Sequence, residues 1–289
     1  MNAPIVIAHR GASAYRPEHT LAAYRLAIEL GADYIEPDLV ATKDHRLVAR
    51  HENDITATTD VARHPEFADR KRGNGWFTED FTLAELRTLR AVERLPELRP
   101  ANTEFDERIP TFEEVLELAQ QAGVGIYPET KHPAYFRSLG LPLEEPLLAT
   151  LRSAGWDRPG SPVFIQSFEA ANLKELRRTI AVPLVQPTSP ATVPDVRDIA
   201  GYADAVGPHK DQIVPRDREN RLATPTTLVA DAHRAGLLVH PYTFRPENEF
   251  LPEDFRDDPA GELALFYELG VDGVFADAPD VAVAARTGG

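Results

Sequence analysis

The sequence predicts an α/β fold, a TIM (β/α)8 barrel with an inserted cap segment after its second strand. Eight short apolar segments alternate with helical ones along the 289 residues, and eight is the strand count of such a barrel. Polar side chains gather where these strands end, and this rim is where TIM barrels place their chemistry. A doubly wound open sheet is disfavoured because no strand is followed by a glycine-rich G-x-G-x-x-G loop.

The composition narrows the class of protein. Hydrophobic residues make up 43% of the chain, which is enough for one large domain with a sizeable core. The formal charge of −15 argues against a nucleic-acid partner but allows a small phosphorylated substrate, which needs only local positive charge. Cysteine is absent, which excludes disulfides, a thiolate nucleophile and a zinc–thiolate site.

The distribution of apolar residues argues against stable membrane insertion. No apolar run approaches the roughly 20 residues that a membrane-spanning helix needs. The chain leads from Met1 through Pro4 straight into an apolar segment, without the pattern of a signal peptide. We therefore expect a protein that stays in the cytoplasm or has lost a leader, and the sequence carries no signal for its oligomeric state.

The first strand and helix are predicted near the N-terminus. Residues 4–10 form an apolar strand that ends in His9, Arg10 and Gly11. An amphipathic helix follows over residues 20–30 and is closed by Gly31.

The second strand begins at Tyr34 and carries Glu36 and Asp38. These residues are two apart in a strand, so their side chains project to the same side. A tight turn at residues 43–46 and a short return strand bring His51 near this pair.

Residues 55–110 break the alternation and are predicted to be an insertion that packs over one end of the same domain, with a helix around residues 83–90. Thr111 and Glu114 then form a capping box before a helix over residues 112–122. The remaining strands are expected at residues 125–131, 162–168, 183–186, 203–207, 237–244 and 271–276, and the remaining helices at 144–153, 169–178, 195–200, 225–235 and 262–269.

The paired carboxylates are the main candidate for a metal site. Glu36 and Asp38 could each form a salt bridge, as isolated acidic residues usually do, but two on one face of an apolar strand repel unless a cation or proton lies between them. Glu129 and Lys131 repeat this spacing on the third strand. Glu129 would complete a set of oxygen ligands, which suits Mg²⁺ or Ca²⁺, and Lys131 would reach a bound phosphate.

Two histidines are candidates for proton transfer. His9 lies beside Arg10, a pair that suits phosphate binding with proton transfer, although a capping histidine and a salt-bridged arginine would look the same. Glu18 either complements the start of the first helix or orients Arg10 or His9. His51 gains importance from its pairing with His9, because two imidazoles beside a metal-bound phosphate can act in turn as base and acid.

Three further residues could contact a substrate. Gln166, at the end of the fourth strand, could donate a hydrogen bond to the substrate or simply cap the strand. Tyr242 and Phe244 alternate on the seventh strand and could line a pocket, although aromatic residues there often belong to the core.

As an ordered set, these motifs resemble the glycerophosphodiester phosphodiesterase family. The motifs are His9-Arg10-Gly11, Pro17-Glu18-x-Thr20, Glu36-x-Asp38 with His51, and Glu129-x-Lys131. The likeness spans nearly the whole chain, including Gly75-Trp76-Phe77 and Tyr242-Thr243-Phe244-Arg245. Two positions depart from the family pattern: His19 stands where Asn is usual, and His45 occupies a turn where Gly is common. Neither departure removes a proposed ligand.

The resemblance implies a TIM barrel with an inserted cap that cleaves glycerophosphodiesters to glycerol 3-phosphate and an alcohol. In that picture Glu36, Asp38 and Glu129 hold a divalent cation, Mg²⁺ or Ca²⁺, Arg10 and Lys131 bind phosphate oxygens, and His9 and His51 act as general base and acid. The glycerol hydroxyl next to the phosphate attacks phosphorus, and water then opens the cyclic phosphate. Two alternatives are a lyase-type relative that releases a cyclic phosphate from a lysophospholipid or sphingolipid, and a non-catalytic barrel that binds metal or glycerol phosphate.

We predict that His9→Ala or His51→Ala nearly abolishes turnover and leaves the fold intact, because one general acid–base contact contributes about 10²–10⁴-fold in rate. Release of glycerol phosphate and circular dichroism measure the two effects. Full activity in either variant would remove that histidine from the mechanism.

Overall fold

The computed structural model describes residues 3–287 and confirms the TIM barrel. Within this range the barrel has eight parallel strand positions, two of which are interrupted. They are β1 (Ile5–His9), β2 (Tyr34–Glu36) continued by β3 (Asp38–Ala41), β7 (Gly125–Ile126) continued by β8 (Glu129–Thr130), β9 (Ile165–Gln166), β10 (Leu184–Thr188), β11 (Ala205–Pro208), β12 (Leu238–Val239) and β13 (Gly273–Ala276). Pro37 and Pro128 lie at the two interruptions. A proline has no N–H to donate to the neighbouring strand, so the ladder of hydrogen bonds breaks there.

The barrel closes between the first and last strands. Strand β1 pairs in parallel with β2 on one side and with β13 on the other. Strands β12 and β13 are joined by backbone hydrogen bonds, in which Phe275 N–H donates to the carbonyl of Pro241 (3.0 Å) and Asp272 N–H to that of Val239 (2.9 Å). Closure leaves no free sheet edge in the ring, which is the defining feature of a barrel.

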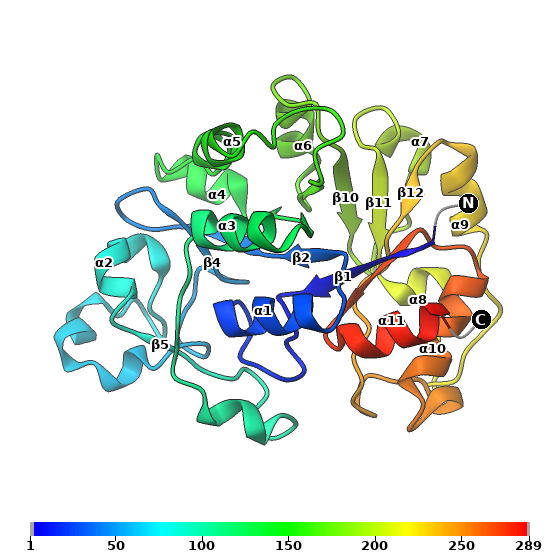
Figure 1. Ribbon diagram of the computed structural model, residues 1–289, viewed down its shortest axis with the longest axis horizontal. Coiled ribbons are helices and arrows are strands. Elements are labelled where there is room, and N and C mark those ends of the chain that lie inside the picture. The colour runs from blue at the N-terminus through cyan, green and yellow to red at the C-terminus, as the bar shows by residue number, and fades with distance from the viewer. Residues whose placement is uncertain (1–2, 288–289) are drawn as a thin grey trace.

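Helices connect the barrel strands and pack around them (Figure 1). They are α1 (Leu21–Glu29), α3 (Phe112–Ala122), α4 (Pro133–Ser138), α5 (Glu144–Ser153), α6 (Ala170–Leu176), α7 (Val196–Ile199), α8 (Lys210–Ile213), α9 (Leu228–Arg234), α10 (Pro259–Glu268) and α11 (Pro279–Thr287). Helices α3 and α5 have the predicted bounds, and the capping box of Thr111 and Glu114 is present. The short helices α4 and α8 and the last helix α11 were not expected from the sequence.

A long segment separates the second and third barrel strands. Strand β4 (Leu47–Ala49) returns antiparallel to β3, and residues 50–110, here named the β4–α3 segment, then run to helix α3. This segment contains 3₁₀ turns at Val61–Arg63, Pro65–Arg70, Thr78–Asp80 and Pro100–Glu104, helix α2 (Leu83–Leu86), and an antiparallel pair of β5 (Arg90–Ala91) and β6 (Glu107–Arg108). Helix α2 is shorter than predicted, since the chain turns into β5 at Arg90.

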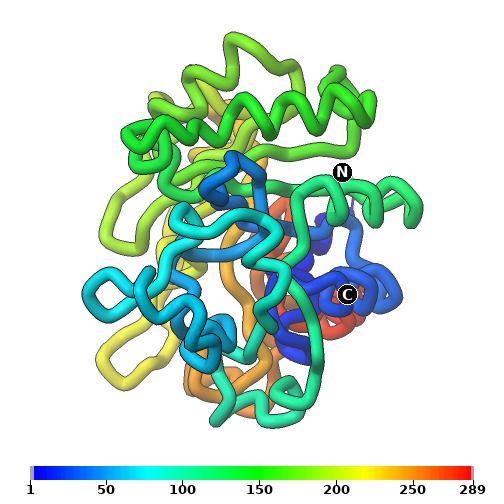
Figure 2. The backbone as a smooth tube through the Cα atoms, turned by 90° about the vertical axis from the view of Figure 1, so that its left-hand side faces the viewer, coloured from blue at the N-terminus to red at the C-terminus, as the bar shows by residue number. Residues whose placement is uncertain are grey.

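The β4–α3 segment lies on the side of the barrel toward which β1 points, and Figure 2 views the molecule from that side. The carboxyl ends of parallel strands share one rim, so this is the rim where the polar residues were expected. That the segment is an inserted cap remains a prediction.

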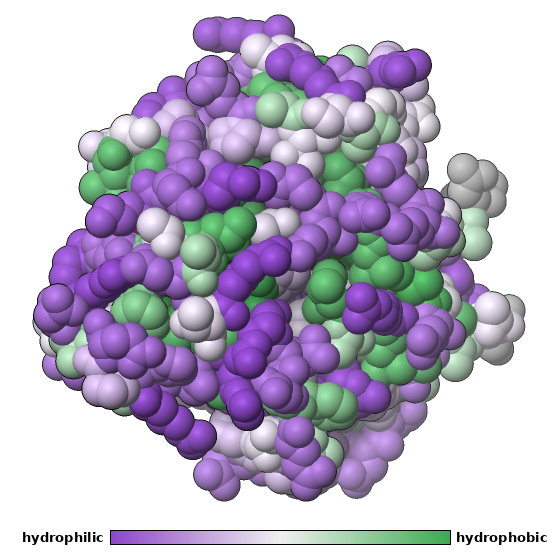
Figure 3. All heavy atoms as spheres, turned by 60° about the vertical axis from the view of Figure 1, so that its left-hand side comes forward, coloured by the Kyte–Doolittle hydropathy of each residue, from purple (hydrophilic) through white to green (hydrophobic). Residues whose placement is uncertain are grey.

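The barrel interior is filled by side chains rather than open. Ile7, Val185 and Phe275 pack around Tyr127, whose hydroxyl is 2.8 Å from Nδ1 of His240. The face seen in Figure 3 is mostly hydrophilic, and hydrophobic patches lie between its polar side chains. Among residues 3–287, no helix is both long and apolar enough to cross a membrane.

Gly11, directly after His9 and Arg10, holds the end of β1 against helix α1. Its φ is +86°, a left-handed conformation that favours glycine, and a Cβ added there would lie 2.7 Å from the backbone carbon of Ala23. Both the backbone conformation and the close approach therefore exclude a side chain at this position.

We predict that Gly11→Ala destabilises the fold more than Gly123→Ala. Gly123 also has a positive φ, +71°, but a Cβ there meets nothing within 4 Å. The control should lose about 1–2 kcal/mol from conformation alone, and Gly11→Ala about 1–3 kcal/mol more from overpacking. Urea unfolding measures both variants, and equal losses would mean that the contact with Ala23 adds nothing.

Candidate active site

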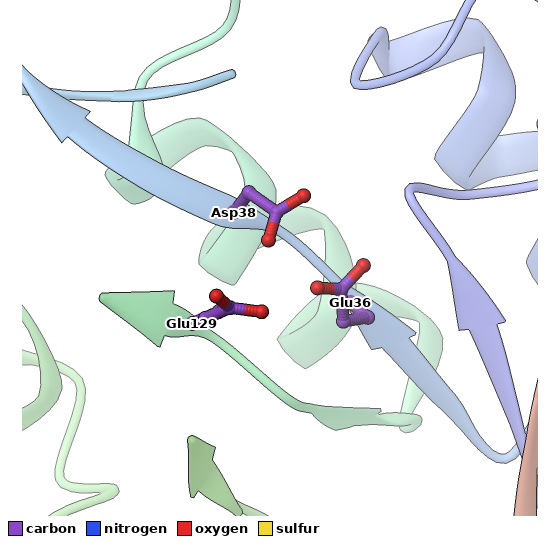
Figure 4. Close-up of side chains that lie close together, drawn as sticks. All are labelled: Glu36, Asp38 and Glu129. Carbon is purple, nitrogen blue, oxygen red and sulfur yellow. The ribbon is translucent and has the colours of Figure 1, made fainter. Parts of the chain in front are cut away.

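Strand register brings the predicted metal ligands together. Asp38 on β3 is the cross-strand partner of Glu129 on β8, and Glu36 on β2 is the partner of His9 on β1. Ligand oxygens of Glu36, Asp38 and Glu129 all lie within 4.8 Å of one another, and all three residues are buried. Figure 4 shows the three carboxylates projecting into one space from two adjacent strands.

The charges in this cluster are not balanced by protein groups alone. Burial, together with the charges of Asp38 and Glu129, raises the pKa of Glu36 well above its usual value. Burial also raises the pKa of Glu129 to about 7, against the attraction of Lys131. Burial acts in the same sense on Asp38, but the charge of Lys131 and the interactions with His51 and His19 together outweigh it and hold the pKa of Asp38 well below its usual value.

The three carboxylates fit a hard divalent cation. All the donors are oxygens, which Mg²⁺ and Ca²⁺ prefer. Oδ1 of Asp38 is buried and, within residues 3–287, accepts no hydrogen bond. The nearest ammonium, Nζ of Lys131, lies 3.6 Å from it. A cation between the carboxylates would satisfy this oxygen and remove the repulsion that disfavours ionised Glu36.

Neighbouring groups hold the carboxylate of Glu36 in place. The backbone N–H of Arg10 donates to its Oε2 (2.8 Å), and Nε2 of Gln166 donates to its Oε1 (3.1 Å). The side chain of Gln166 therefore contacts a proposed metal ligand in this structure, and its predicted contact with substrate stays a prediction.

His19 holds the carboxylate of Asp38 in place in a similar way. Its Nε2 lies 2.9 Å from Oδ2 of Asp38, and its Nδ1 lies 2.7 Å from the hydroxyl of Tyr24. Its φ is +56°, and His45 has a φ of +58°, so both residues that depart from the family pattern have left-handed backbone conformations. Asn and Gly, the usual residues there, adopt this conformation readily.

Two positively charged side chains lie beside the carboxylates. Nζ of Lys131 lies 2.7 Å from Glu129, and Nε of Arg10 lies 3.4 Å from Asp38. Glu18 accepts a hydrogen bond of 2.9 Å from the guanidinium of Arg10, which is one of the two roles considered for it. The nearby acids raise the pKa values of Arg10 and Lys131, so both stay charged and available to an anion.

Each predicted catalytic histidine is held at Nδ1 by a carboxylate. Nδ1 of His9 donates to Oδ1 of Asp277 (2.6 Å), and Nδ1 of His51 donates to Oε1 of Glu52. Burial and the charge of Arg10 lower the pKa of His9 to about 4 and also lower that of His51. Both rings are therefore neutral at pH 7, with Nε2 left for proton transfer.

The aromatic candidates separate into two environments. Tyr242 donates to the carbonyl of Thr188 (2.7 Å) and meets the ring of Phe168 edge-on, at 5.9 Å between centroids. Phe168 is 44% exposed, and the centroid of its ring lies 5.6 Å from Nζ of Lys131. An aromatic ring therefore lies next to the ammonium group of Lys131. Phe244 is 3% exposed and packs against Phe266, and its part in substrate binding stays a prediction.

Several residues that contact the candidate site have no clear signal in the sequence. For Glu52 the signal is its position directly after His51. Arg94 and Arg99 lie in the β4–α3 segment, where no periodicity marks a face, and Phe168 follows the fourth strand without a motif.

A cavity of about 1040 Å³ lies elsewhere, between residues 190–197 and helix α9. None of its lining residues belongs to the carboxylate cluster or to the histidine pair. The buried acidic, basic and imidazole groups, rather than this cavity, mark the candidate active site.

The barrel and the groups at its rim are those of a TIM-barrel phosphodiesterase. The sequence profile of the Glycerophosphoryl diester phosphodiesterase family matches residues 9–281, and the chain belongs to this family. Glycerophosphodiester phosphodiesterase GDPD6 of Arabidopsis thaliana is 39% identical, over 95% of this chain and 83% of that protein. A glycerophosphodiester phosphodiesterase of Haemophilus influenzae is 32% identical, over 96% of this chain and 88% of that protein.

Solved structures share the fold. A phosphodiesterase from Oleispira antarctica, in complex with the product sn-glycerol-3-phosphate, has a TM-score of 0.72 at 23% identity, over 98% of this chain and 96% of its own. A glycerophosphodiester phosphodiesterase from Agrobacterium tumefaciens has a TM-score of 0.65 at 19% identity, over 97% and 99%.

We predict that added Mg²⁺ or Ca²⁺ raises the melting temperature and that Glu36→Gln loses this rise. A ligand present at 100 times its dissociation constant stabilises the folded state by about 2.7 kcal/mol. Without cation, Glu36→Gln should melt close to the wild type, because it also removes a like charge from the cluster.

Glu29→Gln is the matched control, since Glu29 is an exposed residue of α1. It should keep the full response, measured by differential scanning fluorimetry with chelator and with each cation. An undiminished response in Glu36→Gln would show that the cation binds elsewhere.

Proposed function

We propose that this chain hydrolyses glycerophosphodiesters to sn-glycerol 3-phosphate and an alcohol, with a divalent cation held by Glu36, Asp38 and Glu129. The observation that carries the proposal is the meeting of these three buried carboxylates with two neutral imidazoles and two cationic side chains at one rim. Membership of the family and the product bound to the Oleispira antarctica relative support the substrate class.

A divalent cation held by Glu36, Asp38 and Glu129, Mg²⁺ or Ca²⁺, would supply positive charge that lowers the barrier to attack on a phosphodiester anion. Arg10 and Lys131 add positive charge beside it and hold phosphate oxygens. Because burial and ion pairs fix both side chains, little rearrangement is needed when charge builds up on the phosphate.

Two imidazoles move the protons. One neutral ring, His9 or His51, accepts the proton of the glycerol hydroxyl next to the phosphate, and its oxygen forms a bond to phosphorus. The bond from phosphorus to the leaving alcohol breaks. The second ring, which takes up a proton from water when the phosphodiester anion binds beside it, gives that alcohol a proton. Water then opens the cyclic phosphate with the roles of the rings reversed, so protons balance over the cycle.

Tyr242 and Phe168 form the candidate wall for the alcohol or glycerol carbon atoms. Their rings meet edge-on beside Lys131, and Phe168 exposes apolar surface at the rim. An apolar surface of this kind accepts carbon atoms without competing for the phosphate.

We predict that glycerophosphocholine with Mg²⁺ or Ca²⁺ yields choline and linear sn-glycerol 3-phosphate, and that a chelator stops the reaction. Phosphorus NMR follows the phosphate, and a coupled assay detects sn-glycerol 3-phosphate across several alcohols. A terminal cyclic phosphate would instead support a lyase. Binding of glycerol phosphate without turnover of any glycerophosphodiester would support a non-catalytic barrel.

A further inference from the structure

Two arginines of the β4–α3 segment reach the candidate active site from one short stretch of chain. Arg94 and Arg99 lie five residues apart, after strand β5. The side chain of Arg94 is 28% exposed and that of Arg99 is 6% exposed. Each contacts a carboxylate that in turn holds one of the two proposed catalytic histidines.

Arg94 acts on the side of His51. Its guanidinium donates to Oε2 of Glu52 (2.6 Å) and to Oε1 of Glu18 (2.6 Å). Oε1 of Glu52 accepts the hydrogen bond from Nδ1 of His51, and Glu18 also accepts one from Arg10. Arg94 therefore links Glu52, which holds His51, to Glu18, which orients Arg10.

Arg99 acts on the side of His9. It donates to Oδ2 of Asp277 (2.7 Å), while the other oxygen of Asp277 accepts from Nδ1 of His9 (2.6 Å). The same guanidinium donates to Glu247 (2.6 Å) and to the carbonyl of Ser13 (2.8 Å). Arg99 thus holds Asp277 from a fixed position that three separate parts of the chain define.

The two contact chains have the same chemistry. A carboxylate that accepts from Nδ1 of an imidazole fixes the tautomer and the ring plane, and so decides which nitrogen faces the reacting atoms. The carboxylate performs this task only while it is ionised and held. Ion pairs with arginine favour the ionised form, and the bidentate contact of Arg94 with Glu52 also restricts the rotation of that carboxylate.

We propose that Arg94 and Arg99 are positioning residues that set the orientation and tautomer of His51 and His9 through Glu52 and Asp277. The β4–α3 segment is thereby part of the catalytic apparatus and not merely a cover over the barrel. This inference rests on the proposed function, because it assigns both histidines to the reaction. The competing explanation is that the arginines only fasten the segment to the barrel.

The test compares Arg94→Gln and Arg99→Gln with the control Arg70→Gln. Arg70 lies in the same segment and forms a bidentate pair with Glu85 (2.5 and 2.7 Å), but this pair stays inside the segment. All three variants therefore lose an arginine–glutamate or arginine–aspartate contact, and only two of these contacts lead to a histidine.

The first readout is nitrogen-15 NMR of the imidazoles in the resting enzyme, with signals assigned from His9→Gln and His51→Gln spectra. Arg94→Gln should shift the ring nitrogens of His51 and leave those of His9 unchanged, and Arg99→Gln should do the converse. Arg70→Gln should change neither. If neither active-site variant shifts its ring, or if Arg70→Gln gives the same shifts, the proposal is wrong.

The second readout is steady-state kinetics on glycerophosphocholine. Loss of an outer contact that orients a functional group typically costs about 10–100-fold, and we expect this loss in kcat with KM little changed. Combining Arg99→Gln with Asp277→Asn should cost no more than Asp277→Asn alone, because the arginine acts through the carboxylate. Additive losses would refute that route.

Two design choices keep the outcomes separate. Since Arg99 is buried, Arg99→Lys replaces Arg99→Gln if the latter does not fold, and its single ammonium should restore part of the His9 signal position. The NMR readout needs no substrate. If the variants shift as expected but the wild type cleaves no glycerophosphodiester, the proposed function is refuted. If the wild type is active and the variants do not shift, the positioning role is refuted.

Discussion

The burial of three carboxylates at one point on the barrel rim is the constraint on which the rest of the site depends. Two unit charges 4 Å apart interact by about 4 kcal/mol even at an effective dielectric constant of 20, and ligand oxygens of Glu36, Asp38 and Glu129 lie within 4.8 Å of one another. Such a cluster survives only with compensation. Lys131 and Arg10 each contact two of its members, Gln166 and His19 each contact one, and a cation would complete the neutralisation.

The same compensation prepares the site for an anion. The acids hold Arg10 and Lys131 charged and in fixed positions beside the proposed cation site. A phosphodiester would bring one negative charge to a place where positive groups are already gathered, and would bind there without first drawing side chains out of water. The arrangement therefore links the stability of the rim to its chemistry, because both depend on the same few ion pairs.

Much of this could be predicted from the sequence, for reasons that particular residues make clear. The two-residue spacing of Glu36 and Asp38, and of Glu129 and Lys131, gave the shared face, and the capping box at Thr111 located helix α3. Prolines shortened strands that looked continuous by apolar pattern. The contacts of Arg94 and Arg99 could not be foreseen, because they depend on how a segment without periodicity packs against distant strands.

The contact between His9 and Asp277 joins residues 268 positions apart. At a synthesis rate of about 5–20 residues per second, a ribosome needs on the order of 10–50 s to travel between them. During that interval strand β1 has emerged, but its partner β13 has not, so one side of β1 has no neighbour. The contact that holds His9 therefore cannot form until strand β13 and Asp277 have emerged, and it cannot guide the folding of the residues made before them.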